Sequence, residues 1–302
     1  MPQAEPRSLG IDSGGVRLHG LEWGVGGEPM LLVPGLGQSA HIYRELAPVL
    51  AADRRVVAVT PRAHGESGAP AAGYTVAGFA ADLRGAMDAL EMERAAVMAH
   101  SASGVIATRL AADYPERVSR LVYLDGIYDY AGRGDLVSRN PFPPPPRPYF
   151  RSGPENRAWL RRYALAGFWC GALDADLAAR RSSREESRRL ELLTDLLRDI
   201  IDHPHPFAEL RCPALALVAG EEVETLFSWL DPADTGSRAR AEAYLHNVRT
   251  PWRRTAIERF RWEARRARVV EISGGHYFFL SARDRVADEI RAFLQTPFPT
   301  ES

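Results

Sequence analysis

The stretch AAVMAHSASGVIATRL, residues 95–110, runs from an apolar strand through a turn of small residues into a helical pattern. A serine on a sharp strand-to-helix turn projects its hydroxyl away from the sheet. The N-terminus of the following helix adds backbone N–H groups and a partial positive charge, which favour a developing anion. Such a turn needs small neighbours, which are Ala99 and Ser103. We interpret Ser101 as a candidate nucleophile, although similar strings also occur in ordinary alanine-rich helices.

A second turn, PGLG at residues 34–37, follows a short apolar strand predicted at 30–33. In acyl transfer, N–H donors must meet the oxygen on which negative charge develops. The backbone N–H groups of Leu36 and Ala102 are the candidate donors, because the first lies in this turn and the second follows the candidate nucleophile. An ordinary strand-to-helix turn would also explain these glycines.

A serine hydroxyl becomes a good nucleophile only when a neighbouring imidazole accepts its proton. Among the eight histidines, His276 follows Gly274 and Gly275 at the end of the strand predicted at 268–272. Ligands of open parallel sheets bind at this carboxyl edge. We therefore interpret His276 as the candidate base, and we expect His100 to pack or hydrogen-bond beside the turn.

Five segments together resemble the α/β-hydrolase superfamily, and they occur in the family's order: LVPGLG at 32–37, PRAHGES at 61–67, AHSASG at 99–104, YPERVSRLVYLDG at 114–126 and SGGHYFFLS at 273–281. Ala63, Ala99 and Ser103 stand where that pattern usually has glycine. The resemblance implies a mostly parallel central sheet with helices on both faces and a helical cap inserted after the sixth strand. It also implies a serine hydrolase with a Ser, acid, His triad.

The triad acid has three candidates. In the superfamily the acid most often follows the strand that here is ALALVAG at 214–220, but the expected position falls on Val223, which cannot accept an imidazole N–H. Glu222 and Glu224 flank that position and remain alternatives. A second location, used by proteins that look like haloalkane dehalogenases, is the end of the preceding strand, where LVYLD provides Asp125. We favour Asp125, although an aspartate there could simply cap the turn.

Alternation of apolar and amphipathic segments predicts the organisation of the chain. Strands are expected near 16–22, 30–33, 55–59, 95–98, 118–124, 214–219 and 268–272, with helices such as 75–90, 101–114 and 283–295. This α/β alternation predicts a mainly parallel sheet that is covered on both faces. The pattern breaks after Tyr130 in a Pro- and Gly-rich stretch, which introduces helical segments around 155–170 and 184–201.

We therefore predict a core made of residues 1–130 and 207–302, and a helical cap of residues 131–206 that lies over Ser101. The aromatic and apolar content of the cap favours a pocket for an acyl or alkyl group. These side chains could equally form the cap's own small core. The predicted lining of the substrate pocket comprises Gly35, His100, Trp159, Phe168, Trp169 and Tyr277.

The composition excludes several other mechanisms. The chain has no lysine, so all 38 basic side chains are arginine. Walker phosphate loops, Schiff-base and pyridoxal-phosphate enzymes and Ser-Lys hydrolases each need a lysine amine. Two cysteines cannot make a four-thiolate zinc site, and no H-E-x-x-H string occurs. We predict neither a metal nor a cofactor.

Charge and hydropathy indicate a small-molecule partner. The net charge of −1, with arginines and acids mixed, argues against a nucleic-acid partner. The N-terminus lacks an apolar signal region, and no stretch approaches the roughly 18 to 20 apolar residues of a membrane span. We expect a cytoplasmic protein that has no membrane partner, and the oligomeric state cannot be predicted.

The resulting hypothesis is a cofactor-independent hydrolase that cleaves a small to medium, uncharged carboxylic ester or lactone through an acyl-enzyme on Ser101. The same group of residues can also cleave amides and C–C bonds, so a hydrolase of that kind remains an alternative. A ligand sensor that keeps the pocket but turns over negligibly is the alternative from a different class.

Overall fold

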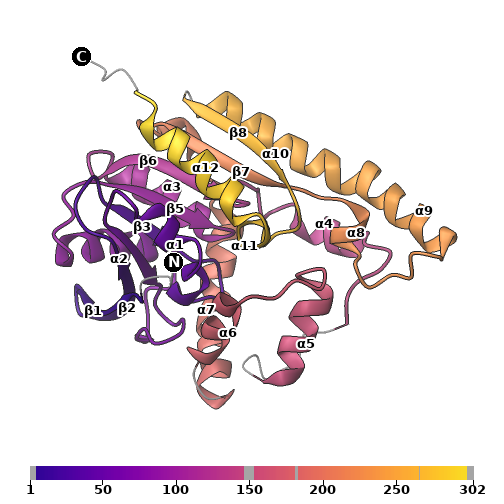
Figure 1. Cartoon of the computed structure of the whole chain (residues 1–302), viewed down its shortest axis with the longest axis horizontal. Helices are drawn as coiled ribbons and strands as arrows, with labels where there is room; N and C mark the ends of the chain where they lie inside the picture. The colour runs from indigo at the N-terminus through magenta and orange to yellow at the C-terminus, as the bar shows by residue number, and fades with distance from the viewer. Residues whose placement is uncertain (1–4, 146–152, 181–182, 265, 298–302) are drawn as a thin grey trace.

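An eight-stranded, mostly parallel β-sheet forms the centre of the molecule (Figure 1). The computed structural model describes residues 5–145, 153–180, 183–264 and 266–297. The strand order is β1-β2-β4-β3-β5-β6-β7-β8, with the bounds β1 (Arg7–Ser13), β2 (Val16–Trp23), β3 (Met30–Val33), β4 (Val56–Thr60), β5 (Ala95–His100), β6 (Val118–Leu124), β7 (Ala214–Gly220) and β8 (Ala267–Ser273). Only β2 pairs antiparallel with its neighbours, β1 and β4. The predicted fold class is confirmed, and all seven predicted strands are present.

Strand β1 is the one strand that the sequence does not predict. It lies at the edge of the sheet, and only Ile11 and Ser13 are buried in its polar sequence RSLGIDS. Gly14 and Gly15 both have positive φ, at 58° and 89°, and this turn folds the strand back onto β2. A two-residue turn with positive φ at both positions matches the twist of a hairpin. Edge strands that are half exposed lack the apolar run that reveals the inner strands.

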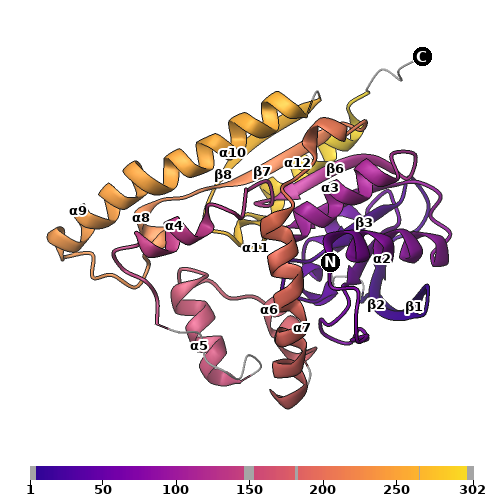
Figure 2. The ribbon, with the colours of Figure 1, turned by 180° about the vertical axis from the view of Figure 1, so that it is seen from behind.

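Helices cover both faces of the sheet, as the alternating pattern predicts. One apolar cluster joins the sheet to α2 (Val76–Ala89), α3 (Ser103–Asp113), α7 (Ser183–Asp202) and α10 (Thr250–Glu263). The other joins it to η1 (Ala40–Tyr43), α1 (Ala47–Leu50), α6 (Gly171–Ala178), α11 (Phe278–Ser281) and α12 (Arg283–Gln295). Figure 1 has α12 towards the viewer, and Figure 2 has α3 and α7 towards the viewer. Strands β3, β4 and β5 are buried along their whole length, because side chains on both of their faces are covered.

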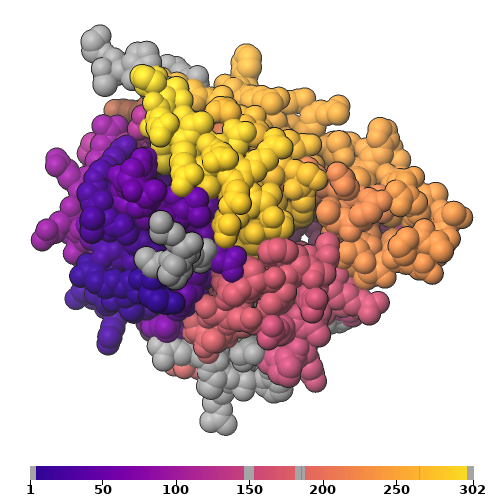
Figure 3. Space-filling view, viewed as in Figure 1, coloured from indigo at the N-terminus to yellow at the C-terminus, as the bar shows by residue number. Residues whose placement is uncertain are grey.

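A helical segment separates β6 from β7, where the sequence predicts the cap. Its described helices are α4 (Arg133–Ser138), α5 (Pro154–Tyr163), α6 and α7. The backbone N–H and hydroxyl of Ser39 both bind the buried Asp176 carboxylate, at 2.6 and 2.7 Å, and the N–H of Val76 binds Asp199 at 2.6 Å. In Figure 3 the pink and red segment lies against the C-terminal part of the chain. A buried carboxylate on α6 and a partly buried one on α7 thus fasten this segment to the rest of the molecule.

A second helical segment separates β7 from β8, and the sequence analysis does not predict it. It comprises α8 (Val223–Leu226), α9 (Thr235–Tyr244), the π-helical turn η3 (Leu245–Arg249) and α10. The last three form one long rod that runs beside β8 and projects beyond the sheet (Figures 1 and 2). Pro251 lies in the first turn of α10, where its missing N–H is tolerated. The rod is rich in arginine and largely exposed, so its apolar periodicity is weak. No helix of the described residues is long and apolar enough to cross a membrane.

Three buried histidines, His64, His100 and His205, predict a loss of stability in mild acid. Burial lowers the pKa of His64 to about 4, and it lowers the pKa of His100 and that of His205 to about 3 each. In the unfolded chain all three titrate near about 6.5, so below that pH the unfolded state binds more protons than the folded state. The free energy of unfolding should fall by about 1.4 kcal/mol per pH unit for each histidine between about pH 6 and pH 4.

Urea unfolding at several pH values in this range measures the slope. His205→Gln should make the slope shallower by one histidine's share, whereas His203→Gln, at a histidine whose side chain is 67% exposed, should leave it unchanged. A free energy of unfolding that stays constant through this range would contradict the prediction.

Candidate active site

Ser101 occupies a sharp turn between β5 and α3. Its φ of 57° lies in the left-handed region, which is strained for a residue other than glycine. The Ser101 N–H donates to the carbonyl of Leu124 at 3.0 Å, and the Ser101 carbonyl accepts from Gly104 at 2.9 Å. These bonds keep the turn in place between the end of a buried strand and the first turn of the helix.

Close backbone contacts explain why the residues around this turn are small. A Cβ on Gly104 would lie 2.0 Å from the carbonyl oxygen of Gly126, and a Cβ on Gly126 would lie 2.8 Å from that of Ser101. The Ser103 hydroxyl donates to the carbonyl of Pro34 at 2.6 Å. The start of α3 therefore packs directly on the backbone that follows β6, which leaves no room for larger side chains.

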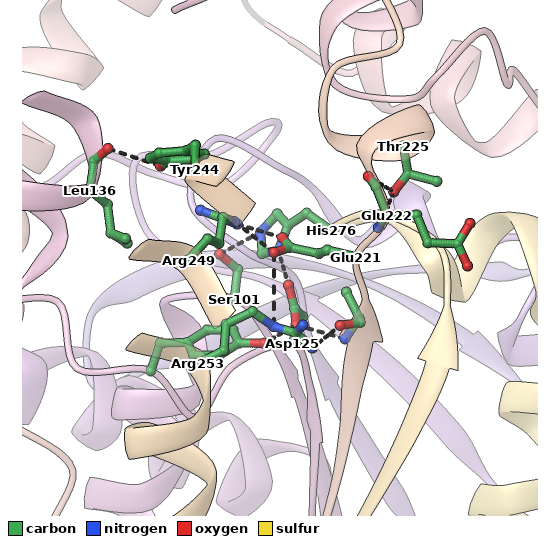
Figure 4. A network of polar contacts seen from close by, with 12 residues as sticks. Ser101, Asp125, Leu136, Glu221, Glu222, Thr225, Tyr244, Arg249, Arg253 and His276 are labelled. Atoms are coloured by element: carbon green, nitrogen blue, oxygen red, sulfur yellow. Dashed lines mark hydrogen bonds and ion pairs between the residues drawn. The ribbon is translucent and has the colours of Figure 1, made fainter. Parts of the chain in front are cut away.

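Three of the predicted site residues form a chain of hydrogen bonds (Figure 4). The Ser101 hydroxyl oxygen lies 2.9 Å from Nε2 of His276, and Nδ1 of His276 lies 2.6 Å from Oδ2 of Asp125. These residues follow β5, β8 and β6, so the carboxyl ends of three parallel strands bring them together. An imidazole placed between a hydroxyl and a carboxylate can take the hydroxyl proton while the carboxylate compensates the new positive charge.

Asp125 is a buried carboxylate with an exposed fraction of only 2%. Its Oδ1 accepts hydrogen bonds from the Tyr128 hydroxyl at 2.5 Å and from the Ala219 N–H at 3.0 Å. Burial alone would raise the pKa of Asp125, but the contacts with His276, Ala219 and Tyr128 outweigh it and hold that pKa well below its usual range. Asp125 is therefore charged at neutral pH.

Two arginines of the rod bind groups at the end of β7, the strand whose Ala219 N–H contacts Asp125. Arg253 on α10 donates to the carbonyl of Ala219, the residue whose N–H binds Asp125. Arg249 binds the carboxylate of Glu221, at 2.5 and 2.6 Å, beside the same strand end (Figure 4). Sequence reasoning finds neither Tyr128 nor Arg253. No motif includes Tyr128, and nothing distinguishes Arg253 among the many arginines of a helix that is itself unpredicted.

His100 lies behind His276, with only 1% of its surface exposed. Its Nδ1 is 2.9 Å from Oε1 of Gln38, its Nε2 is 3.1 Å from the carbonyl of His276, and the two imidazole rings are 4.6 Å apart. Burial, with a smaller contribution from His276, lowers the pKa of His100 to about 3. This neutral side chain supports the loop that carries His276, and its burial makes it a poor candidate for direct contact with a substrate.

The candidate oxyanion donors lie on two adjacent turns. A Cβ on Gly35 would lie 3.1 Å from Cβ of Ser101 and 2.8 Å from Nδ1 of His100, so the PGLG loop packs directly on the turn. Within the described part of the chain, the N–H groups of Leu36 and Ala102 donate no hydrogen bond to protein. Both donors are thus available, and their role as an oxyanion hole stays a prediction.

The two glutamate alternatives for the triad acid lie elsewhere. Glu224 is largely exposed and forms an ion pair with Arg238 at 2.7 Å. Glu222 precedes α8, where its side chain and that of Thr225 cap the helix reciprocally. The imidazole of His276 faces Asp125 instead, so the geometry disfavours both glutamates.

The predicted pocket aromatics divide into two groups. The Tyr277 ring lies 5.5 Å from that of His276. Trp159 packs against Tyr163 at 5.6 Å, and the Trp169 indole donates to Asp174, all within the helical segment after β6. Trp159, Phe168 and Trp169 also border the apolar cluster that contains α6 and α12. The contribution of these three to a substrate pocket stays a prediction.

Tyr130 is a further neighbour of Ser101 that no sequence motif distinguishes. Burial raises the pKa of Tyr130 to about 12, and the Ser101 side chain opposes this shift by a smaller amount. The residue follows β6 at the start of the helical segment. A neutral phenol at this position can donate a hydrogen bond to an oxygen near Ser101.

Comparison with known proteins identifies the family. Residues 28–292 match the model of the alpha/beta hydrolase fold family. The chain belongs to this family. A fluoroacetate dehalogenase of a Burkholderia species is 33% identical over 125 residues, which are 40% of this chain and 41% of that protein. Mouse epoxide hydrolase 4 is 31% identical over 118 residues, 38% of this chain and 33% of that one. Both matches span less than half of the relative's length.

Solved structures agree in fold over nearly the whole chain. A probable hydrolytic enzyme of Pseudomonas aeruginosa PAO1 has a TM-score of 0.67 at 24% identity, covering 96% of this chain and 94% of that one. A bacterial membrane phospholipase A has a TM-score of 0.70 at 21% identity, covering 96% and 86%. At this identity, the likeness establishes the fold.

The contacts of Asp125 predict that Tyr128→Phe lowers the stability of the protein without unfolding it. The change removes one hydrogen bond to a charged group, which is worth about 1.5 to 3 kcal/mol, while the Ala219 N–H still binds the same oxygen. The free energy of unfolding should fall by about that amount. Urea unfolding measures the loss.

Tyr74→Phe is the matched control, because its hydroxyl donates to a neutral acceptor, the carbonyl of Pro70. If Tyr128→Phe lowers the free energy of unfolding no more than Tyr74→Phe does, the bond to the charged Asp125 adds nothing beyond an ordinary hydrogen bond, and the prediction is wrong.

Proposed function

We propose that this protein is a serine hydrolase that cleaves a carboxylic ester or lactone through an acyl-enzyme on Ser101. The observation that carries the proposal is the hydrogen-bonded chain from Asp125 through His276 to Ser101, together with the left-handed backbone of the serine. We further propose that residues 131–206 act as a cap over this site.

The proposed reaction has two halves. As Oγ of Ser101 attacks the substrate carbonyl, Nε2 of His276 takes the hydroxyl proton and the N–H groups of Leu36 and Ala102 bind the oxyanion. The C–O bond to the leaving alcohol then breaks, and His276 returns its proton to that alcohol. Water repeats the sequence on the acyl-enzyme, which releases the acid and restores the serine. Asp125 keeps the imidazole oriented and compensates its charge throughout.

The nucleophile type favours acyl transfer over the reactions named for some relatives. A serine that displaced a halide or opened an epoxide would form an ether, and water has no carbonyl carbon to attack in an ether. A serine that attacks an ester forms a new ester, which the same residues can hydrolyse. The presence of serine at position 101 therefore supports ester chemistry for this chain rather than dehalogenation or epoxide opening.

Cleavage of amides or C–C bonds needs the same residues and a different leaving group, so it is the nearest alternative. A panel of esters, lactones, amides and β-diketones distinguishes these reactions by relative kcat/KM. A non-catalytic ligand sensor would bind members of the panel and release them unchanged.

The proposal predicts covalent labelling at a single serine. A fluorophosphonate probe should label the wild-type protein, and Ser101→Ala should abolish the labelling, because the probe reacts only with an activated hydroxyl. Ser103→Ala is the matched control, since this neighbouring hydroxyl is buried and bound to Pro34. In-gel fluorescence and mass spectrometry of the labelled peptide provide the readout. A wild-type protein that stays unlabelled would overturn the enzymatic proposal.

A second prediction concerns the acid. Asp125→Asn should lower kcat by about 10²- to 10⁴-fold, because the imidazole loses its orientation and its counter-charge. Glu222→Gln and Glu224→Gln should remain within about twofold of the wild type, since neither glutamate contacts His276. Circular dichroism and urea unfolding check that each variant folds. Normal turnover by Asp125→Asn would exclude Asp125 as the acid.

A further inference from the structure

Two histidines and a glutamate that the proposed reaction does not use converge on one point. His19 belongs to β2, His41 to η1, and Glu66 to the loop PRAHGES that follows β4. Oε2 of Glu66 lies 3.2 Å from Nδ1 of His19 and 3.2 Å from Nε2 of His41. The three atoms all lie within 4.8 Å of one another. Ligand atoms from three separate elements thus face a common centre.

The spacing of these atoms suits a small divalent ion. Zinc binds histidine nitrogen at about 2.0–2.1 Å and carboxylate oxygen at about 2.0–2.2 Å, so two ligand atoms of a tetrahedral site lie about 3.3 Å apart. The two distances to the Glu66 oxygen, 3.2 Å each, match this spacing, whereas the two imidazole nitrogens lie within 4.8 Å of each other and would close around an ion by rotation of the side chains. Two imidazoles and one carboxylate also leave the fourth position open for water.

The surroundings hold both imidazoles in place. The two rings stack with their centroids 5.5 Å apart and an angle of 16° between their planes. Nε2 of His19 lies 3.3 Å from the Ser8 hydroxyl, a polar partner of the kind that orients a metal-binding histidine from its far side. The side chains of His19 and His41 are only 11% and 13% exposed, whereas Glu66 is 40% exposed and leaves a path for an ion.

Two neighbouring side chains compete with an ion: the Thr60 hydroxyl, which lies 3.2 Å from Nδ1 of His19, and the Arg44 guanidinium. Its Nη1 lies 3.3 Å from Nδ1 of His41, and another of its nitrogens binds Glu5. A histidine that coordinates through Nε2 carries its proton on Nδ1, so ion binding requires Arg44 to turn away from that nitrogen. The exposed carboxylate of Glu5 already provides an alternative partner for Arg44.

We propose that His19, His41 and Glu66 bind one divalent transition-metal ion of the zinc class. The mixture of imidazole and carboxylate ligands suits Zn²⁺ better than Ca²⁺ or Mg²⁺, which prefer oxygen. The ion would join β2, η1 and the loop after β4, and so would stabilise the two loops that follow β3 and β4. This site shares no residue with Ser101, His276 or Asp125, so the proposal does not depend on the proposed function.

Calorimetric titration of the chelator-treated, full-length protein with zinc chloride tests the proposal. We expect saturable binding of one equivalent and a higher Tm in the presence of Zn²⁺, because the ion binds only the folded state. Glu66→Gln and His41→Gln should each weaken binding by at least about 10-fold, since changes even to supporting groups have effects of this size. Arg44→Gln should strengthen binding, because it removes one competing donor.

His203→Gln is the matched control, because His203 also lies beside a carboxylate, Asp199 at 3.1 Å, but on the surface and without a second histidine. It should bind zinc as the wild type does. Failure of the wild-type protein to bind Zn²⁺ would overturn the proposal, and so would equal binding by wild type and Glu66→Gln. If a ligand variant does not fold, Arg44→Gln provides the test: stronger Zn²⁺ binding than wild type supports the proposal, and unchanged or weaker binding contradicts it.

Discussion

The close packing of the first turn of α3 on the backbone after β6 is the constraint on which the site depends. Gly104 and Gly126 approach so closely that neither can carry a side chain, and this contact keeps Ser101 in a left-handed conformation. A strained serine persists only where its surroundings determine its backbone. The strain, in turn, directs the hydroxyl away from the sheet and towards His276, so the geometry of the nucleophile follows from packing between backbones.

The second constraint on the site is that the buried charge of Asp125 must be compensated by hydrogen bonds. An isolated buried carboxylate is costly, and it is tolerated only when hydrogen bonds compensate its charge. Here the imidazole, a tyrosine hydroxyl and the N–H of Ala219 compensate it. Arg253 on the rod then binds the carbonyl of Ala219, so a helix that lies outside the sheet helps to hold the strand end that orients the acid.

The relatives that resemble part of this chain are named for different reactions, which include fluoroacetate dehalogenation and epoxide hydrolysis. The carboxyl edge of a parallel sheet brings loops from separate strands together, so exchange of one side chain on one turn can change the reaction without changing the fold. For this chain the chemistry of serine, rather than likeness to any relative, favours ester cleavage. The helical segment between β6 and β7 is fastened to the loop after β3, because Asp176 on α6 binds Ser39.

Local sequence determined seven of the eight strands, the turn at Ser101 and the placement of His276 after β8, because apolar runs and glycine positions act over a few residues. Only the tertiary structure brings Asp125 to His276, because the pairing of β6 with β7 places Ala219 against Asp125, while α8 directs Glu222 to its own helix cap. Strand β1 and the rod also escaped prediction, since an exposed edge and an arginine-rich helix carry little apolar signal. The same holds for Tyr128, Arg253 and the meeting of His19 with His41 and Glu66. Contacts between residues far apart in the chain depend on how the elements pack, and no local pattern encodes them.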